Sequence, residues 1–324
     1  MTPFQWFLSY LKKYRWYMIA GLVLVVVTTV LALVSPYISG RIVDDVIQGG
    51  AYDLLLNLIL ALVAVTVLRS ALRFTFLMLF ETSSQGVLYS LREAVFKKFM
   101  KEDFDFYNRN RTGDLMSRQT GDMDAVRHFV SHVIYFSFEN VLTFVMALVM
   151  IFTVNVKLAV CMLIVLPFTA LITYCQSKEI KPTFEKVRRC FSSLNAFAQE
   201  NISGNRVVKA FAKEDFETQK FDKENDAYRD AQIESSNVWR KYIPIFEIFS
   251  NLLTVVLMVV GGLMVIQKEM TMGQFVTVNG YLWMLNNPLR QFGWIINDAQ
   301  RFFTSIEKIF STYSVEPEIR ELEV

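Results

Sequence analysis

The sequence contains few of the residues that build metal sites and disulfide frameworks. It has two histidines and three cysteines in 324 residues, and no two cysteines form a C-x-x-C pair. Cysteines so widely spaced indicate neither a zinc site nor a set of disulfides. His128 and His132 lie four residues apart and could share a metal, but Glu139 is two turns further on, so we expect interhelical contacts instead. No nucleophile motif lies near the histidines, so no catalytic residue is expected.

The sequence also lacks a strong net charge and a phosphate-binding loop. Its formal net charge is +2, so the total favours no nucleic-acid partner. No G-x-x-x-x-G-K-[ST] motif occurs, and no Gly-rich signature could complete an ATP site. This chain is therefore expected to be no enzyme by itself and to hold no cofactor.

Long apolar runs are what the sequence has in abundance. It is 53% hydrophobic and only 20% charged, a balance typical of a membrane protein. A spanning helix needs about 20 mostly apolar residues, and the first run is too long for a cleavable signal peptide. Six segments qualify as spans: Trp16–Ile38, Leu54–Phe76, Val133–Val154, Leu158–Tyr174, Ile243–Ile266 and Phe275–Trp294. The fold class predicted is an all-α membrane protein with six transmembrane helices.

The distribution of Lys and Arg predicts the orientation of these spans. Basic residues gather before the first span and in two long connections, residues 81–132 and 177–241, whereas the other connections are short and nearly neutral. By the positive-inside rule, both termini and both long connections are cytoplasmic. The simplest expectation is a multi-pass protein located in a bacterial inner (plasma) membrane. Residues 1–15 combine Phe4, Trp6 and Phe7 with a basic end, which suits a helix lying in the membrane interface.

The two long connections are predicted to be helical stalks. They lack Pro/Gly/Ser tracts and keep apolar residues at helical spacing, so the spanning helices should continue for about 35–40 Å into the cytoplasm. Residues 108–113 (NRNRTG) break the first stalk, and a weaker break is expected near Gly204, followed by a short helix at about Phe211–Thr218. The apolar positions are Val87, Leu91, Val95, Phe99, Val126, Phe129 and Val133 in the first stalk, and Phe184, Val187, Phe191, Leu194, Phe197 and Ala198 in the second.

Two stretches in these stalks carry a family resemblance. FDFYNRNRTGDLMSRQTGDMDAV and ENISGNRVVKAFAKEDF resemble the first and second intracellular loops of MsbA-like ABC exporters of the multidrug type. The resemblance extends over almost the whole chain. Gly121 stands where the family usually has Asn, and Asn205 where it has an apolar residue, which affects the local helix geometry.

The resemblance implies a type I ABC exporter fold in a domain-swapped dimer. Residues 1–15 would be the elbow helix, 16–310 the six-helix transmembrane domain, and 311–324 the start of a linker to a nucleotide-binding domain. The chain would thus have lost its ATPase domain or use one on another chain. Each stalk tip would be a coupling helix, near 107–115 and 211–218. The residues implied are Tyr107, Asn108, Arg109, Thr112, Gly113, Asp114 and Leu115 in the first, and Phe211, Ala212, Lys213, Glu214, Asp215 and Phe216 in the second.

The function implied is that of the membrane-spanning part of an ATP-driven exporter. Its partners would be a second transmembrane domain (the same or a related chain), two ABC ATPase domains that use ATP and Mg, membrane lipid, and an amphipathic small-molecule, lipid or peptide substrate. The alternative is a membrane scaffold or signalling protein whose stalks bind other cytoplasmic partners. A secondary transporter is disfavoured by the two long hairpins and the lack of clear hydropathy repeats.

Polar residues recur on one face of several predicted spans. Ionisable side chains in a span usually face a cavity or a partner helix. We therefore expect these faces to line a substrate pathway, with pairing between helices as the alternative. The candidates are Arg69, Arg73, Phe76, Glu247, Asn251, Trp283, Asn286, Arg290, Trp294 and Asn297. Glu247 is the nearest acidic partner expected for the three arginines, so some of these could hold an anionic group of the substrate.

Overall fold

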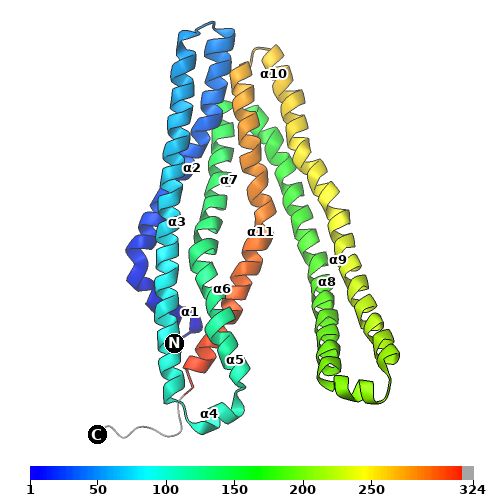
Figure 1. Cartoon of the computed structure of the whole chain (residues 1–324). Helices are drawn as coiled ribbons and strands as arrows, with labels where there is room; N and C mark the ends of the chain where they lie inside the picture. The colour runs from blue at the N-terminus through cyan, green and yellow to red at the C-terminus, as the bar shows by residue number, and fades with distance from the viewer. Residues whose placement is uncertain (316–324) are drawn as a thin grey trace, which may run out of the picture. The chain divides into compact units, whose positions relative to one another are not determined.

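The chain is helical throughout the part that the structure, a computed structural model, describes: residues 1–315 contain no strand (Figure 1). The α-helices are α1 (Pro3–Leu11), α2 (Arg15–Arg41), α3 (Asp53–Lys101), α4 (Phe104–Arg109), α5 (Thr112–Ser117), α6 (Met123–His128), α7 (Ile134–Val154), α8 (Val156–Ala210), α9 (Glu214–Val256), α10 (Gly262–Ile266) and α11 (Met272–Tyr313). A 3-10 turn at Lys12–Tyr14 joins α1 to α2. Wider π-helical turns lie at Ile42–Gln48, Arg118–Asp122, Phe129–Val133 and Leu257–Gly261. The all-α prediction is confirmed for this part of the chain.

Five helical stretches are long and apolar enough to cross a membrane. They are Pro3–Gln48, Asp53–Lys101, Thr112–Val154, Val156–Ala210 and Glu214–Ile266, and they contain the first five predicted spans. The sixth predicted span lies within α11, outside this set. Polar residues along α11, among them Asn279, Asn286 and Arg290, lower its hydropathy.

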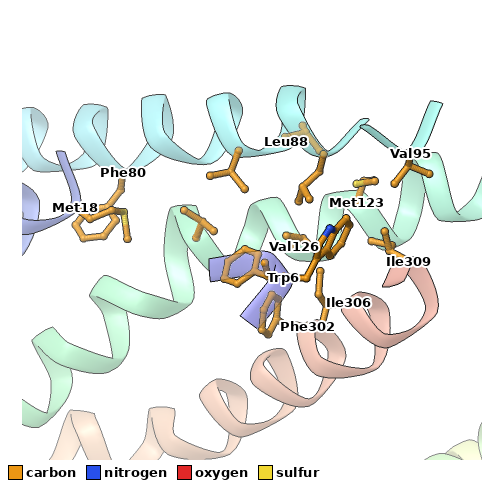
Figure 2. Close-up of a cluster of buried hydrophobic side chains, with 14 of the residues drawn as sticks. Trp6, Met18, Phe80, Leu88, Val95, Met123, Val126, Phe302, Ile306 and Ile309 are labelled. Atoms are coloured by element: carbon orange, nitrogen blue, oxygen red, sulfur yellow. The ribbon is translucent and has the colours of Figure 1, made fainter. Parts of the chain in front are cut away.

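The helices form two compact units, and the first comprises residues 1–159 together with the chain from residue 259 onward. Its core follows the C-terminal half of α3, where Val87, Leu91 and Val95 are at most 1% exposed. Val126 of α6 packs into the same cluster (Figure 2). The apolar spacing of the first stalk therefore predicted its buried face correctly.

Two further segments, which were not assigned to this core from the sequence, complete it. α1 inserts Trp6 and Phe7, which are 3% and 1% exposed, and the end of α11 contributes Phe302, whose ring centroid lies 4.9 Å from that of Phe7. Figure 2 shows Trp6 beside Ile306 and Ile309 of α11. The first stalk is thus a bundle of α1, α3, α6 and α11 rather than a coiled pair.

A capping box fixes the start of α1. The Thr2 hydroxyl accepts a hydrogen bond from the Gln5 amide (3.2 Å), and the Gln5 side chain accepts one from the Thr2 amide (3.1 Å), with Pro3 in the first turn. Such reciprocal bonds satisfy amides that a helix start leaves free. Of the apolar residues that predicted an interfacial helix, Phe4 and Leu8 are each 41% exposed, so α1 presents one apolar edge outward while Trp6 faces the core.

At the other end of the first unit, the π-helical turn Ile42–Gln48 is hydrogen-bonded to the start of α11. The Asp44 carboxylate accepts hydrogen bonds from the Thr271 hydroxyl and the Gly273 amide, both at 2.6 Å. The helices approach so closely here that a Cβ on Gly273 would overlap the Gly40 carbonyl oxygen and the Asp44 carboxylate. Only glycine is compatible with this approach without a shift of the backbone.

The second unit, residues 160–258, is an antiparallel hairpin of α8 and α9 (Figure 1). Charged pairs join the two helices along their length: Lys241 Nζ lies 2.8 Å from a Glu179 carboxylate oxygen, and Lys186 Nζ lies 2.5 Å from one of Glu234. The hydrogen bonds from Lys241 and Tyr242 hold the pKa of Glu179 below its ordinary value. Polar pairs therefore contribute to the register of this stalk where apolar burial is slight.

The expected break near Gly204 is wrong. α8 continues without interruption to Ala210, and α9 begins at Glu214. No short separate helix forms at Phe211–Thr218, because Phe211–Lys213 is the turn itself and the rest is the first turn of α9. Ala212 adopts a left-handed conformation (φ 48°), which reverses the chain without glycine.

Candidate substrate pathway and coupling segments

The first stalk ends in two short helices, α4 and α5, separated by Asn110 and Arg111. The Asp103 carboxylate caps α4 by accepting a hydrogen bond from the Phe106 amide (2.9 Å), and the Tyr107 hydroxyl donates to the Phe99 carbonyl (2.6 Å). These bonds close the tip onto the end of α3. The segment predicted near 107–115 is therefore a helix–break–helix rather than one helix.

Most of the predicted residues at this tip are exposed. They are Tyr107, Asn108, Arg109, Thr112, Gly113 and Asp114. Leu115 differs, because it is 4% exposed and belongs to the core of the first unit. Phe104 belongs to the loop motif that carries the resemblance, but the predicted coupling residues began at Tyr107 and left it out; it is 89% exposed at the start of α4. An N-capping Asp103 directly before this Phe was the signal that could have placed it at a helix start.

All six residues predicted at the second tip are exposed. They are Phe211, Ala212, Lys213, Glu214, Asp215 and Phe216. Phe211 is 73% exposed and Phe216 is 52% exposed. Three acidic residues in the first turn of α9, at 214, 215 and 217, interact favourably with the positive end of the helix dipole and so stabilise the start of α9. The tip is a tight turn that presents an aromatic side chain to its surroundings.

The predicted pathway residues of α11 share one exposed face. Trp283, Arg290, Trp294 and Asn297 are exposed and Asn286 is half-buried. The opposite face packs into the first unit, where Tyr281 and Leu285 are fully buried. Spacings of three and four residues thus separated the exposed face of α11 that carries Trp283, Arg290 and Trp294 from the buried face that carries Tyr281 and Leu285.

The arginines of α3 have an acidic partner that the sequence did not indicate. Arg73 Nη1 lies 3.9 Å from a carboxylate oxygen of Glu139 in α7, whose side chain is 16% exposed. Glu247 was expected to be the acidic residue nearest to the three arginines, but in the structure the ion pair with Arg73 is made by Glu139. Arg69 lies one turn away and is half-buried. Glu139 therefore reduces the surplus positive charge on which an anion site would depend.

Three further pathway candidates occupy different environments. Phe76 is fully buried in the core of the first unit, with its ring 5.4 Å from that of Tyr135, so in this structure it is not on a lining face. Glu247 and Asn251 are exposed on α9 in the second unit.

A pocket near the N-terminal end of the third predicted span and the C-terminal end of the sixth brings both histidines together with a carboxylate from another helix. His128 Nε2 lies 3.2 Å from Asp298 Oδ2 of α11, and His132 Nδ1 lies 2.9 Å from the Tyr135 hydroxyl. Interhelical contacts were the expected role for this pair, and His128 makes one. Within residues 1–315 no group of three side chains has the arrangement of a metal site. Asp298 was missed because it is 170 positions away in sequence.

Comparison with known proteins gives a consistent result. Residues 18–289 match the ABC transporter transmembrane region. An uncharacterized ABC transporter ATP-binding protein, YknU of Bacillus subtilis, is 30% identical over 98% of this chain and 54% of its own length. The multidrug resistance-like ATP-binding protein MdlA of Escherichia coli is 26% identical over 97% of this chain and 54% of its own length. The ATP-dependent lipid A-core flippase of Syntrophus aciditrophicus is 25% identical over 85% and 46%, respectively.

The chain spans about half the length of the curated relatives it matches. The match covers most of the chain: it includes most of the first apolar helical stretch, the whole of the other four, and most of the sixth predicted span. On this evidence the protein is a multi-pass membrane protein, and the chain belongs to the ABC transporter transmembrane region family.

Proposed function

We propose that the chain forms the membrane-spanning half of an ATP-driven exporter, and that its two stalk tips receive the motion of ATPase domains. The observation that carries this proposal is the exposure of Phe211, 73%, at the turn between α8 and α9. A large apolar side chain at the end of a stalk adds nothing to the protein's own core. Val207 and Phe216, 61% and 52% exposed, lie within five residues of Phe211, and a group of exposed apolar side chains is typical of an interaction site.

The stalk geometry suits mechanical transmission. α8 is one uninterrupted helix of 55 residues, of which those beyond Tyr174 would extend about 50 Å from the membrane. Displacement of its tip would move the spanning part of the same helix. ATP and Mg would bind to the ATPase domains, because no residue in this chain supplies a phosphate cradle.

The proposed assembly contains two transmembrane domains and two ATPase domains. Large apolar side chains remain exposed along the second unit, among them Phe184 at 50% and Phe191 at 48%. A second copy or a related chain that packs against α8 and α9 would cover them. The termini and both stalks would be cytoplasmic in a bacterial plasma membrane, as the distribution of Lys and Arg predicts.

The proposed substrate is amphipathic. The exposed face of α11 combines apolar rings, Trp283 and Trp294, with polar groups, Arg290 and Asn297. A face of mixed character can accept the polar and apolar parts of one molecule. The relatives' names include a multidrug resistance-like protein and a lipid flippase, both consistent with cargo of this kind.

Coupled transport tests the proposal. In proteoliposomes that contain this transmembrane region with its ATPase domains, Phe211→Ala should lower the number of substrate molecules moved per ATP hydrolysed. Phe96→Ala is the matched control, because this phenylalanine is 56% exposed and lies on the shaft of the other stalk, in α3, outside both tips and the proposed subunit contact. Equal coupling in both variants and the unchanged protein would contradict the proposal. A stalk partner without ATPase activity would then favour the scaffold alternative.

A further inference from the structure

The pocket beside His128 has walls of different character, each formed by one helical face. On one side three rings stack in a column: the His128 and His132 centroids lie 5.3 Å apart, and those of His132 and Phe136 lie 4.8 Å apart, with interplanar angles of 23° and 22°. On the other side α11 presents Gln291, Trp294 and Asp298 at helical spacing. The pocket has a volume of about 230 Å³ and lies wholly within the first unit.

The charge of the lining favours a cation. Asp298 supplies a carboxylate, and among residues 1–315 no lysine or arginine lines the pocket. Asp298 Oδ2 lies 3.2 Å from His128 Nε2, so the imidazole, in the tautomer with its proton on Nε2, donates to this oxygen and orients the carboxylate. A ligand cation would then meet Oδ1.

The aromatic walls favour an organic cation over a metal ion. The indole of Trp294 is 64% exposed, so much of it can contact a ligand. An ammonium group near an indole face gains cation–π attraction. A metal ion would need several oxygen or imidazole ligands in one place, and no such group occurs within residues 1–315.

The size of the pocket limits what part of a ligand it can hold. Sites for complete drug-sized molecules have volumes of about 300–1,000 Å³, above that of this pocket. A headgroup with one ring or a few methyl groups fits better, with the remainder of an amphiphile outside. Trp294 lies on the exposed face of α11, where such a remainder could continue.

We propose that the pocket formed by His128, His132, Phe136, Trp294 and Asp298 binds the ammonium headgroup of a cationic amphiphile. Asp298 is the counter-ion, Trp294 supplies the cation–π face, and His128 positions the carboxylate. The inference rests on the proposed export function for its physiological meaning. Binding itself, however, requires no ATP and can be measured on this chain alone.

Three soluble probes test the recognition on the unaltered protein in nanodiscs. Benzyltrimethylammonium has both charge and ring, phenylmethanesulfonate has the ring with the opposite charge, and tetramethylammonium has the charge without a ring. Titration by saturation-transfer NMR should give the tightest binding for the first. Equal or tighter binding of the sulfonate would overturn the proposal, as would the absence of benzyltrimethylammonium binding.

Variants locate the site. Asp298→Asn should weaken benzyltrimethylammonium binding about tenfold, at the lower end for loss of an interaction with a charged group. Trp294→Ala should weaken it about three- to tenfold. The matched controls are Glu307→Gln, an exposed carboxylate on the same helix, and Trp16→Ala, an indole that is 68% exposed elsewhere. Unchanged affinity in the pocket variants, or equal losses in the controls, would refute the assignment.

A lipid headgroup and a soluble amphiphile share the ammonium chemistry, and the lipid composition distinguishes them. In phosphatidylglycerol nanodiscs, added phosphatidylethanolamine competes with the probe if a lipid is the natural ligand and leaves binding unchanged if it is not. Failure of transport in the full assembly with the probe still bound would count against the proposed function alone. Normal transport with no probe binding would count against this site alone.

Discussion

Replacement of Trp6 by alanine should detach α1 from the first unit. The side chain is 3% exposed, and its ring lies 4.8 Å from Tyr313 and 5.6 Å from Phe310, centroid to centroid. Truncation of a buried Trp to Ala costs about 3–5 kcal/mol in typical cores. Local opening of α1 would therefore become roughly 100- to 4,000-fold more frequent, since each 1.4 kcal/mol is a factor of ten.

Hydrogen exchange of the α1 amides measures this opening directly, because those amides exchange when the helix detaches. Trp16→Ala is the control: the same residue type ten positions on, 68% exposed, should change exchange in α1 by less than about threefold. If both variants left exchange in α1 unchanged, or accelerated it equally, α1 would not be held by the contacts of Trp6. The helix would then lie in the membrane interface without protein contacts, as its amphipathic sequence alone suggests.

Three further experiments test the contact between α2 and α11, the ion pair of the second stalk and the arginines of the predicted pathway. Gly273→Ala should destabilise the outer end of the first unit by about 1–3 kcal/mol through overpacking, whereas Gly293→Ala, which meets nothing within 4 Å, should be neutral or slightly stabilising in thermal unfolding. The pKa of Glu179 is lowered in the folded protein, so its ion pair with Lys241 stabilises the hairpin fully at pH values above the ordinary carboxyl pKa. This stabilisation is lost as the pH falls through the lowered pKa, and hydrogen exchange of the α8 and α9 amides should become faster there. Glu179→Gln should remove this pH dependence of hydrogen exchange. The double variant Arg69→Ala, Arg290→Ala should reduce substrate-stimulated ATPase with basal ATPase retained, and unchanged stimulation by every anionic substrate would exclude an anion site.

Periodicity predicted most of what depends on one helix at a time. The spacing of Val87, Leu91 and Val95 identified a buried face, and that of Trp283 and Arg290 identified an exposed one. Each result follows from the 3.6-residue turn, which fixes the residues that share a side. A tight turn between the third and fourth spans was also evident, because only residues 155–157 separate the two predicted spans; in the structure the connection is shorter still, Asn155 alone.

Contacts between helices distant in sequence could not be predicted in this way. Nothing in the pattern of residues 1–15 indicates that Trp6 packs against α11 rather than lipid, because both environments are apolar. Pairing of Arg73 with Glu139 and of His128 with Asp298 likewise depends on which helices are neighbours. The continuity of α8 past Gly204 shows a different limit: a single glycine costs only about 1 kcal/mol in a helix, which 55 residues of otherwise regular helix can absorb.

Cysteine crosslinking at the stalk tips tests the central claim most directly. In membranes that contain the assembled transporter, Phe211→Cys and Phe104→Cys should each crosslink to an ATPase domain, because both side chains are exposed at the tips, 73% and 89%. Phe184→Cys, half-exposed on the shaft of α8, should give no such product. Crosslinks from both tips and none from the shaft are the predicted result. No product from either tip, or equal yields at all three positions, would contradict the assignment of these turns as the coupling segments of an ABC exporter.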